Sequence, residues 1–207
     1  MSTQKGKIAI VIEEHFDETE FHRFNDFFPS HGYEVEYVSN LWDQPSLTFK
    51  GNDHNAEVRV TVDLTQVKPD DYAGVILIGG YAMDRLRYQT KLRPGQPNRS
   101  PAVEFLRQAV RAMDQGRLLI GTICHSMWLF CADPSLLKGR NVTCAHNIVC
   151  DVENAGGTVV YENDETATTC IDGNLISGKH PGVVDEFMKI FLERLDRKTA
   201  LQKQASR

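Results

Sequence analysis

The chain has 207 residues, of which 41% are hydrophobic and 25% charged, and its formal net charge is -5. This composition predicts one soluble globular domain over 1–207, and the absence of a long basic run argues against a nucleic-acid partner. No apolar stretch approaches the roughly 18 residues of a membrane helix, and the first apolar run is too short for a signal peptide. We therefore expect a cytoplasmic protein with no membrane partner.

The chain has five cysteines, at positions 124, 131, 144, 150 and 170, and none forms a CxxC pair. An odd number with this spacing is a poor disulfide framework and a poor zinc site. We expect free thiols, no metal and no cofactor, with Cys131, Cys144, Cys150 and Cys170 packing as small hydrophobic residues.

The first third of the chain predicts the start of a parallel α/β unit. β-branched residues over 7–12 favour a strand, phenylalanines at helical spacing favour a helix over 17–30, and alternation over 33–38 favours a second strand. Residues 41–67 are less regular. The alternating "EVRVTV" at 57–62 indicates a small hairpin or an extended excursion there.

Two nearly continuous apolar runs mark the middle of the chain. The runs at 73–80 and 117–123 are typical of strands buried on both faces. Between them we expect a polar surface loop over 88–101, with three prolines, and an amphipathic helix over 102–115. A short helix over 125–131 follows the second run.

The last third predicts short strands and one long helix. In order, we expect a strand at 141–145, a helix at 147–154, strands at 158–162, 167–171 and 174–178, a helix from Pro181 to about Asp196, and a polar tail over 197–207 that frays. Alternating strands and helices of this kind build a parallel sheet, which binds ligands at the carboxyl ends of its strands. Three such ends carry polar or small residues, at 13–17, 79–84 and 123–126.

Cys124 lies where a buried strand turns into a helix, in "RLLIGTICHSMWLF". Small neighbours at Gly121, Thr122 and Ser126 suit a sharp turn that exposes a nucleophile, and a helix N-terminus favours a thiolate. A core cysteine in a strand-to-helix turn explains the same pattern. His125 follows directly and could act as a base, although adjacent helical residues do not face each other, and a solvent-facing ring is the alternative.

Gly79 and Gly80 end the third predicted strand of the sheet. Paired glycines let backbone amides approach a ligand, as an oxyanion site requires, while a simple tight turn is the alternative. Asp84 follows in "YAMDRLR" and could orient a histidine or remain a solvated carboxylate beside Arg85.

Asp17 has two explanations that do not exclude each other. "DETE" is a capping-box pattern, so Asp17 could cap the first helix. Asp17 also follows the first strand on the expected ligand side, where a protonated carboxyl could hydrogen-bond the Cys124 thiolate. Glu13, Glu14 and His15 are alternatives on the same loop.

The order of six segments resembles the ThiJ/PfpI family of the class I glutamine amidotransferase-like superfamily. The segments are "KIAIVI" with its acid-bearing loop, "AGVILIGGYAMDRLR", "GTICHS", "LLKGRNVTC", "NAGG" and "DGNLISGKHPG", which span about 7–195. The resemblance implies a three-layer α/β/α sandwich with a mostly parallel, flavodoxin-like sheet and a nucleophile elbow. It also implies a homodimer or larger homo-oligomer.

Site residues carry over from the family position by position. Cys124 matches the nucleophile and His125 the histidine of the protease-like branch. Asp84 matches an acid that reaches the histidine of a neighbouring subunit, and Asp17 matches the carboxylic acid that hydrogen-bonds the cysteine. Gly80 and the backbone around His125 match oxyanion donors, with Gly79 beside them, and His146 falls where some members place a polar group near the pocket. Family members mostly carry Glu at the two acid positions.

These residues support a cysteine-dependent hydrolase or lyase acting on a small carbonyl compound, a peptide or another amide, as in protease/amidase or glutathione-independent glyoxalase and deglycase chemistry. One alternative is a non-enzymatic oxidative-stress sensor or chaperone that uses the same cysteine. Another is an isocyanide hydratase-like activity, which the aspartate at position 17 suggests. Because one fold supports many activities, the fold cannot choose among these.

Overall fold

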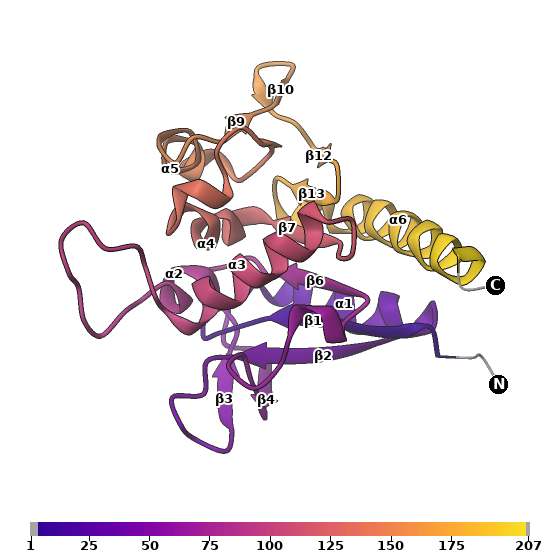
Figure 1. Cartoon of the computed structure of the whole chain (residues 1–207), viewed down its shortest axis with the longest axis horizontal. Helices are drawn as coiled ribbons and strands as arrows, with labels where there is room; N and C mark the ends of the chain where they lie inside the picture. Colours follow the sequence, from indigo (N-terminus) through magenta and orange to yellow (C-terminus); the bar gives the residue numbers. More distant parts are fainter. Residues whose placement is uncertain (1–3, 206–207) are drawn as a thin grey trace.

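The protein, seen here in a computed structural model that describes residues 4–205, is organised around a seven-stranded sheet (Figure 1). Every neighbouring pair of strands is parallel except the edge pair β12–β13. The strand order is β12 (Thr169–Asp172), β13 (Leu175–Gly178), β7 (Ile120–Ile123), β6 (Gly74–Leu77), β1 (Gly6–Val11), β2 (Tyr33–Ser39) and β5 (Val62–Asp63). The expected mostly parallel sheet is confirmed.

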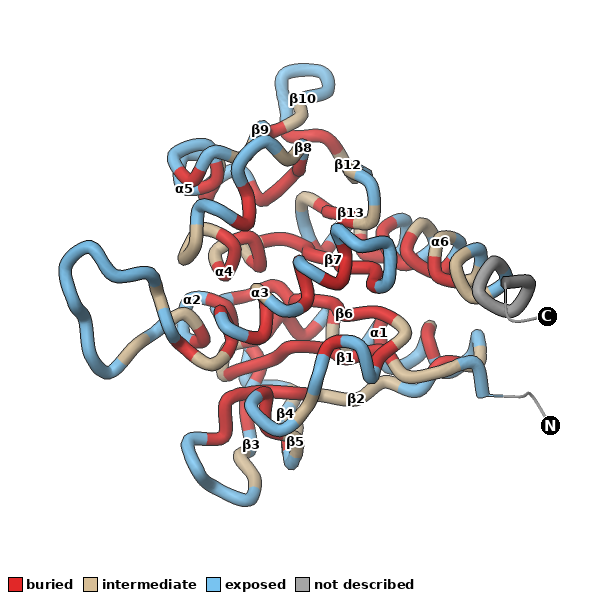
Figure 2. The backbone as a smooth tube through the Cα atoms, in the orientation of Figure 1, coloured by how far each residue is buried: buried red, intermediate tan, exposed pale blue. Residues whose placement is uncertain are grey.

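Helices cover both faces of this sheet and make three layers (Figure 1). One face carries α1 (Glu18–Ser30) and α6 (Val184–Ala205), and the other carries α2 (Ala82–Leu86), α3 (Pro101–Asp114) and α4 (Trp128–Cys131). The central strands β1, β6 and β7 are buried throughout most of their length (Figure 2). Their continuous apolar runs follow from helix packing on both sides.

Phenylalanines join α1 and α6 over the sheet. The ring centroids of Phe24 and Phe187 lie 6.4 Å apart, and those of Phe28 and Phe191 lie 6.0 Å apart. Gly121 in β7 makes this packing possible, because a Cβ there would lie 2.7 Å from the Phe187 ring. α6 therefore packs directly against the backbone of β7.

The excursion after β2 contains the predicted hairpin. β3 (Leu47–Lys50) pairs antiparallel with β4 (Glu57–Val60). Only the first four residues of the alternating segment 57–62 belong to the hairpin, because the chain leaves it after Val60 and residues 62–63 join β2 in the main sheet. One alternating segment thus serves two sheets.

The strands after α4 are shorter than predicted. β8 (Asn141–Val142) pairs only with β9 (Thr158–Val159), and β10 (Tyr161–Glu162) pairs with β11 (Glu165–Thr166), outside the main sheet. A 3-10 helix, η4 (His146–Ile148), and α5 (Val149–Asn154) stand between β8 and β9. β-propensity alone did not reveal that "NVTCA" and "TVVYE" lie off the sheet edge.

The tail predicted over 197–207 is helical as far as Ala205. A short 3-10 helix, η5 (Pro181–Val183), precedes α6, and the helix then continues well beyond Asp196. Lysine, alanine, leucine and glutamine are good helix formers. The Lys198 ammonium also donates to the Arg117 carbonyl, which ties this last part of the helix to the body.

The carboxyl ends of β1, β6 and β7 lie side by side because these strands are neighbours in the sheet. Phe16, in the segment that follows β1, forms isolated β-bridges with Gly80, which follows β6, and with Gly51, which follows β3. The three polar segments identified from the sequence therefore meet at one edge, as expected.

Candidate active site

Cys124 occupies a sharp turn between β7 and the 3-10 helix η2 (Cys124–Met127). Its φ is +59°, a left-handed value that is rare for a residue with a side chain and that persists only where the surroundings enforce it. Ser126 enforces it here, because the Ile123 amide donates to Ser126 Oγ at 2.7 Å and the Thr122 hydroxyl lies 2.7 Å from the same atom. The turn is the predicted elbow, and Cys124 is 5% exposed at its tip.

Gly79 and Gly80 bring the end of β6 against this turn. A Cβ on Gly79 would lie 2.8 Å from Cys124 Cβ, and one on Gly80, whose φ is +73°, would lie 2.3 Å from the His15 carbonyl. Neither position has room for a side chain. The backbone amides of Gly80 and His125 lower the pKa of the Cys124 thiol. These are the two donors expected of an oxyanion site.

Burial nevertheless has the larger effect on the thiol. It raises the pKa of Cys124 to about 12, and a negative charge on Glu20 or Asp17, where the carboxyl is ionised, acts in the same direction. The expectation that a helix N-terminus holds a thiolate is not met. The helical segment that begins at Cys124 is only a 3-10 turn followed by the four-residue α4, so its dipole is small.

Glu20 is a site residue that the sequence analysis missed. It is fully buried, Gly79 N–H donates to its Oε2 at 2.6 Å, and a Cβ on Gly79 would lie 2.5 Å from its Oε1. Glu20 Oε1 and Cys124 Cβ therefore border the same small space, the one that a side chain at position 79 would fill. Oε1 has no partner among the described residues. Burial, with the Asp17 charge, raises the pKa of Glu20 well above its ordinary value, so the carboxyl is protonated at neutral pH.

The role assigned to Asp17 therefore needs correction. Asp17 Oδ1 accepts from the Glu20 amide at 3.0 Å and caps α1, as half of the predicted capping box. The reciprocal half is absent, because the Asp17 amide donates to Gly79 O and the Glu20 carboxyl is held by Gly79 N–H. Asp17 lines the pocket, but Glu20 is the acid that lies against the cysteine.

Helical spacing contained the signal for Glu20. It lies four residues before Phe24 and eight before Phe28, on the stripe that α1 buries. A carboxylic acid on the buried, apolar face of a helix is unusual unless neighbouring groups bind it. The "DETE" pattern concealed this, since a capping box already explains a glutamate at that position.

His125 contacts the cysteine directly. Its Nδ1 lies 3.2 Å from Cys124 Sγ, and its Nε2 lies 2.9 Å from Asn147 Oδ1. An amide oxygen only accepts, so the proton of the neutral ring sits on Nε2 and Nδ1 presents a lone pair to the thiol. Burial lowers the pKa of His125, which keeps the ring neutral at neutral pH.

Asn147 was not identified from the sequence, which pointed to its neighbour His146 and to Asp84. The turn η4 places Asn147 beside His125, and His146 lines the same pocket. Asp84 lies on α2 and accepts from Arg87 Nε at 2.9 Å. Within the chain it makes no contact with His125, so a contact across a subunit interface stays a prediction. No sequence pattern links position 147 to position 125, because the link is made by the fold.

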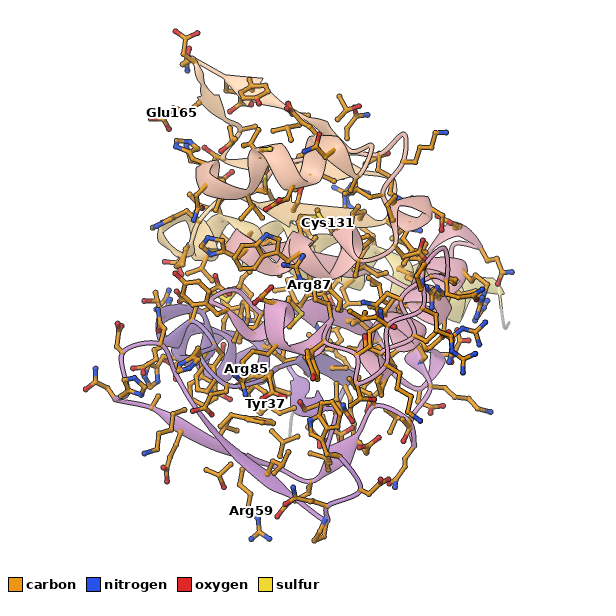
Figure 3. The ribbon with its side chains drawn as sticks, turned by 90° about the vertical axis from the view of Figure 1, so that its left-hand side faces the viewer. Tyr37, Arg59, Arg85, Arg87, Cys131 and Glu165 are labelled. Carbon is orange, nitrogen blue, oxygen red and sulfur yellow. The ribbon has the colours of Figure 1, made fainter. Side chains whose placement is uncertain are left out.

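Two aromatic rings flank the His125 imidazole. Its centroid lies 4.9 Å from Trp128 and 5.7 Å from Tyr81, both in stacked arrangements, and the guanidinium of Arg87, which Figure 3 labels, covers Trp128 at 5.4 Å. Tyr81 and Trp128 are themselves 6.2 Å apart, so the three rings form one cluster beside the thiol. The alternatives on the first loop are engaged elsewhere, because Glu13 pairs with Arg85 and Glu14 accepts from the Lys50 amide.

A cavity of about 630 Å³ opens above the thiol. Its lining includes Asp17, Asn52, Gly80, Tyr81, Cys124, His125, Ala145, His146, Asn147, Glu165, Lys179, His180 and Pro181. Lys179 and Glu165 form an ion pair at 2.6 Å, and His180 Nδ1 accepts from Gly182 N–H at 3.0 Å. Among the three described histidines of this lining, His125 is the one that contacts the Cys124 sulfur.

Metal ligands are not gathered anywhere in residues 4–205: no group of three or more His, Cys, Asp or Glu residues there could hold an ion. All five cysteines are free thiols. Among the helices that the structure describes, none is long and apolar enough to cross a bilayer.

Comparison with known proteins decides the family. A sequence model of the DJ-1/PfpI family matches residues 6–194. This chain belongs to the DJ-1/PfpI family. Relatives within reach of sequence comparison include an uncharacterized protein of Staphylococcus haemolyticus, 28% identical over 189 residues that cover 91% of this chain and 97% of that protein. An uncharacterized protein of Staphylococcus aureus strain Mu50 is 25% identical and covers 91% and 98%.

Solved structures of DJ-1/PfpI proteins share the fold. Drosophila melanogaster DJ-1beta aligns with a TM-score of 0.70 at 20% identity, covering 99% of this chain and 98% of that one. A two-domain protein of Anabaena variabilis, with a DJ-1/ThiJ/PfpI-like and a ferritin-like domain, aligns with a TM-score of 0.75 at 26% identity over 92% of this chain. This chain spans about half of that protein, 48%. The flavodoxin-like sandwich that the resemblance implied is confirmed.

Proposed function

We propose that this DJ-1/PfpI protein is a cysteine-dependent hydrolase or lyase that acts on a small carbonyl or amide substrate. One observation carries the proposal: His125 Nδ1, unprotonated because Nε2 donates to Asn147, lies 3.2 Å from Cys124 Sγ. Nucleophile, base and orienting group stand in the order that covalent catalysis requires.

The raised pKa of the thiol determines how the step starts. With a pKa of about 12, Cys124 is a neutral thiol at neutral pH, so its proton leaves during attack and not before. His125 Nδ1 takes this proton as sulfur bonds to the carbonyl carbon. The carbonyl oxygen becomes an oxyanion, which the amides of Gly80 and His125 are placed to stabilise.

The later steps depend on the substrate. With an amide, the C–N bond breaks as protonated His125 donates to the leaving nitrogen, and water then hydrolyses the thioester. With methylglyoxal, the aldehyde forms a thiohemiacetal, a proton moves from C1 to C2, and water releases lactate from the resulting thioester and restores the thiol.

Protonated Glu20 supports the nucleophile. A neutral carboxyl adds no negative charge near the sulfur. A buried carboxylate at the same place would oppose sulfur ionisation. Glu20 therefore assists the proposed attack by Cys124 because its carboxyl stays protonated.

The two alternatives have weaker support. A peroxide sensor needs an accessible, acidic thiol, whereas Cys124 is 5% exposed and its pKa is raised. An isocyanide hydratase-like activity was suggested by an aspartate on the cysteine, whereas Glu20 occupies that place and Asp17 caps a helix.

The test is turnover of two substrates by purified protein. Methylglyoxal is followed by lactate formation, and a peptide aminomethylcoumarin amide by fluorescence. We expect one of them to be turned over, and Cys124→Ala to lower kcat by at least about 10³-fold. Cys150→Ala, which removes an exposed thiol outside the cavity, is the matched control and should keep the wild-type rate. Comparable turnover by Cys124→Ala contradicts the proposal.

A further inference from the structure

The segment between α2 and α3 has an unusual charge. From Arg85 to Arg99 it carries five cations and no carboxylate, in a chain whose net charge is -5. Two of the five are paired, Arg85 with Glu13 and Arg87 with Asp84. Lys91, Arg93 and Arg99 have no carboxylate partner among the described side chains.

The three unpaired cations line one cavity. The loop that carries them projects from the body beside α2 and α3 and is largely exposed (Figures 1 and 2), and Figure 3 views the molecule from this side. The cavity has a volume of about 440 Å³, and Trp42, Tyr88 and Ser100 also line it. This volume is in the range of small-molecule sites. No lining residue is shared with the cavity above Cys124.

Ser100 adds an observation that is independent of the charges. It is the residue before the first turn of α3, it is 2% exposed, and its Oγ is buried without a hydrogen-bond partner among the described residues. A buried hydroxyl normally has a partner, and a serine at this position usually caps its own helix. Asp17 does so at the start of α1, whereas Ser100 does not. Its hydroxyl therefore has unused hydrogen-bonding capacity beside the cavity that Ser100 lines.

The aromatic rings define a second part of the cavity. Trp42 is 44% exposed and Tyr88 is 62% exposed, although large apolar surfaces are usually covered. Both rings belong to the lining that includes the cations. Exposed aromatic faces beside arginines bind planar rings by stacking.

We propose that this cavity binds a phosphate monoester that carries a planar ring, in the manner of a nucleoside monophosphate. A phosphate monoester has three terminal oxygens and close to two negative charges, which suit two arginine guanidinium groups, a lysine and a hydroxyl. The N-terminal end of the 14-residue α3 favours the same charge. The planar ring would lie against Trp42 and Tyr88.

The experiment is calorimetric titration of the full chain with three probes. Adenosine 5′-monophosphate tests the whole ligand, inorganic phosphate the anion alone, and adenosine the ring alone. We expect saturable binding of the monophosphate at one site per chain, and weaker binding of each fragment. Cys124→Ala should bind the monophosphate as the wild type does, so this result is independent of the proposed catalysis.

Variants assign the binding to the cavity. Arg99→Gln is expected to weaken monophosphate binding about tenfold or more, and Ser100→Ala by several fold. Trp42→Ala should weaken the monophosphate and leave inorganic phosphate unchanged. Arg111→Gln is the matched control, because it removes one exposed arginine of α3 outside the cavity and should have no effect. Thermal unfolding checks that each variant is folded.

Three results would overturn the proposal. One is absence of monophosphate binding to the wild type. Another is an equal loss in Arg99→Gln and Arg111→Gln, which would indicate general charge attraction. The third is a change of oligomeric state in Arg99→Gln on size-exclusion chromatography, with no effect on ligand binding, which would make this face a contact between copies of the chain.

Discussion

The two cavities differ in how their polar groups are satisfied. Above Cys124, most groups already have a partner within the chain: His125 binds Asn147, Lys179 binds Glu165, and His180 accepts from Gly182. Beside α3, Lys91, Arg93 and Arg99 have no carboxylate partner among the described residues. The Ser100 hydroxyl has no hydrogen-bond partner there either.

The difference is consistent with the two proposed roles, catalysis above Cys124 and ligand binding beside α3. A catalytic group needs a defined protonation state and direction before substrate arrives, and internal hydrogen bonds supply both. A group that binds an anion gains most when no internal carboxylate competes for it. Glu20, which is buried and does not line the first cavity, also keeps an unpartnered oxygen, Oε1, among the described residues. Four measurements test this contrast.

The largest effect should come from Asn147. Replacing it by alanine leaves both imidazole tautomers of His125 accessible, so we expect kcat to fall about 10- to 100-fold with little change in KM. Asn25→Ala, which removes an exposed amide of α1, is the control and should leave kcat unchanged. An unchanged kcat in Asn147→Ala would show that the fixed tautomer is not needed.

The pH dependence of kcat/KM is a second test of the contact between His125 and Asn147. Because burial lowers the pKa of His125, we expect the acid limb of kcat/KM to lie below pH 6.5 in the wild type. Asn147→Asp places a carboxylate on Nε2 and should move this limb to higher pH. A limb that does not move would mean that it reports another group.

A smaller effect concerns stability and Glu20. The folded-state pKa is raised, so the folded chain keeps a proton that the unfolded chain releases near pH 4.3. The contribution of Glu20 is therefore fully present below that pH and is lost as pH rises toward the folded-state pKa. Relative to Glu20→Gln, the wild type should lose up to about 1.4 kcal/mol of unfolding free energy per pH unit in this window. Urea unfolding at several pH values measures it, and a difference independent of pH would show that Glu20 is ionised in the fold.

The smallest effect is an order of oxidation. Under dilute peroxide, we expect exposed Cys150 to be modified before Cys124, whose burial and raised pKa disfavour the reactive thiolate. Mass spectrometry of peptides from a time course gives the order. Modification of Cys124 ahead of Cys150, Cys131 and Cys170 would instead support the sensor alternative.

Much of the fold was accessible from local patterns. The apolar runs before Gly80 and Cys124 gave the central strands, and the phenylalanine spacing gave α1, because burial on two faces or on one helix face leaves a direct periodic trace. The failures were segments whose partners are distant. Residues 57–62 divide between two sheets, and of 141–145 only 141–142 pair, with a short strand off the sheet edge, which alternation within a segment does not reveal.

For the site, local sequence predicted the tight turn at Cys124, because its small neighbours and the glycine pair are requirements of a sharp backbone that consecutive residues show. The partners of Cys124 and His125 came from the fold. Asn147 meets His125 because η4 returns to the turn, Glu20 and Cys124 border the same space at Gly79, and Asp17 is a cap. Protonation states depend on burial and on neighbours from several strand ends, and these exist only once the sheet has assembled.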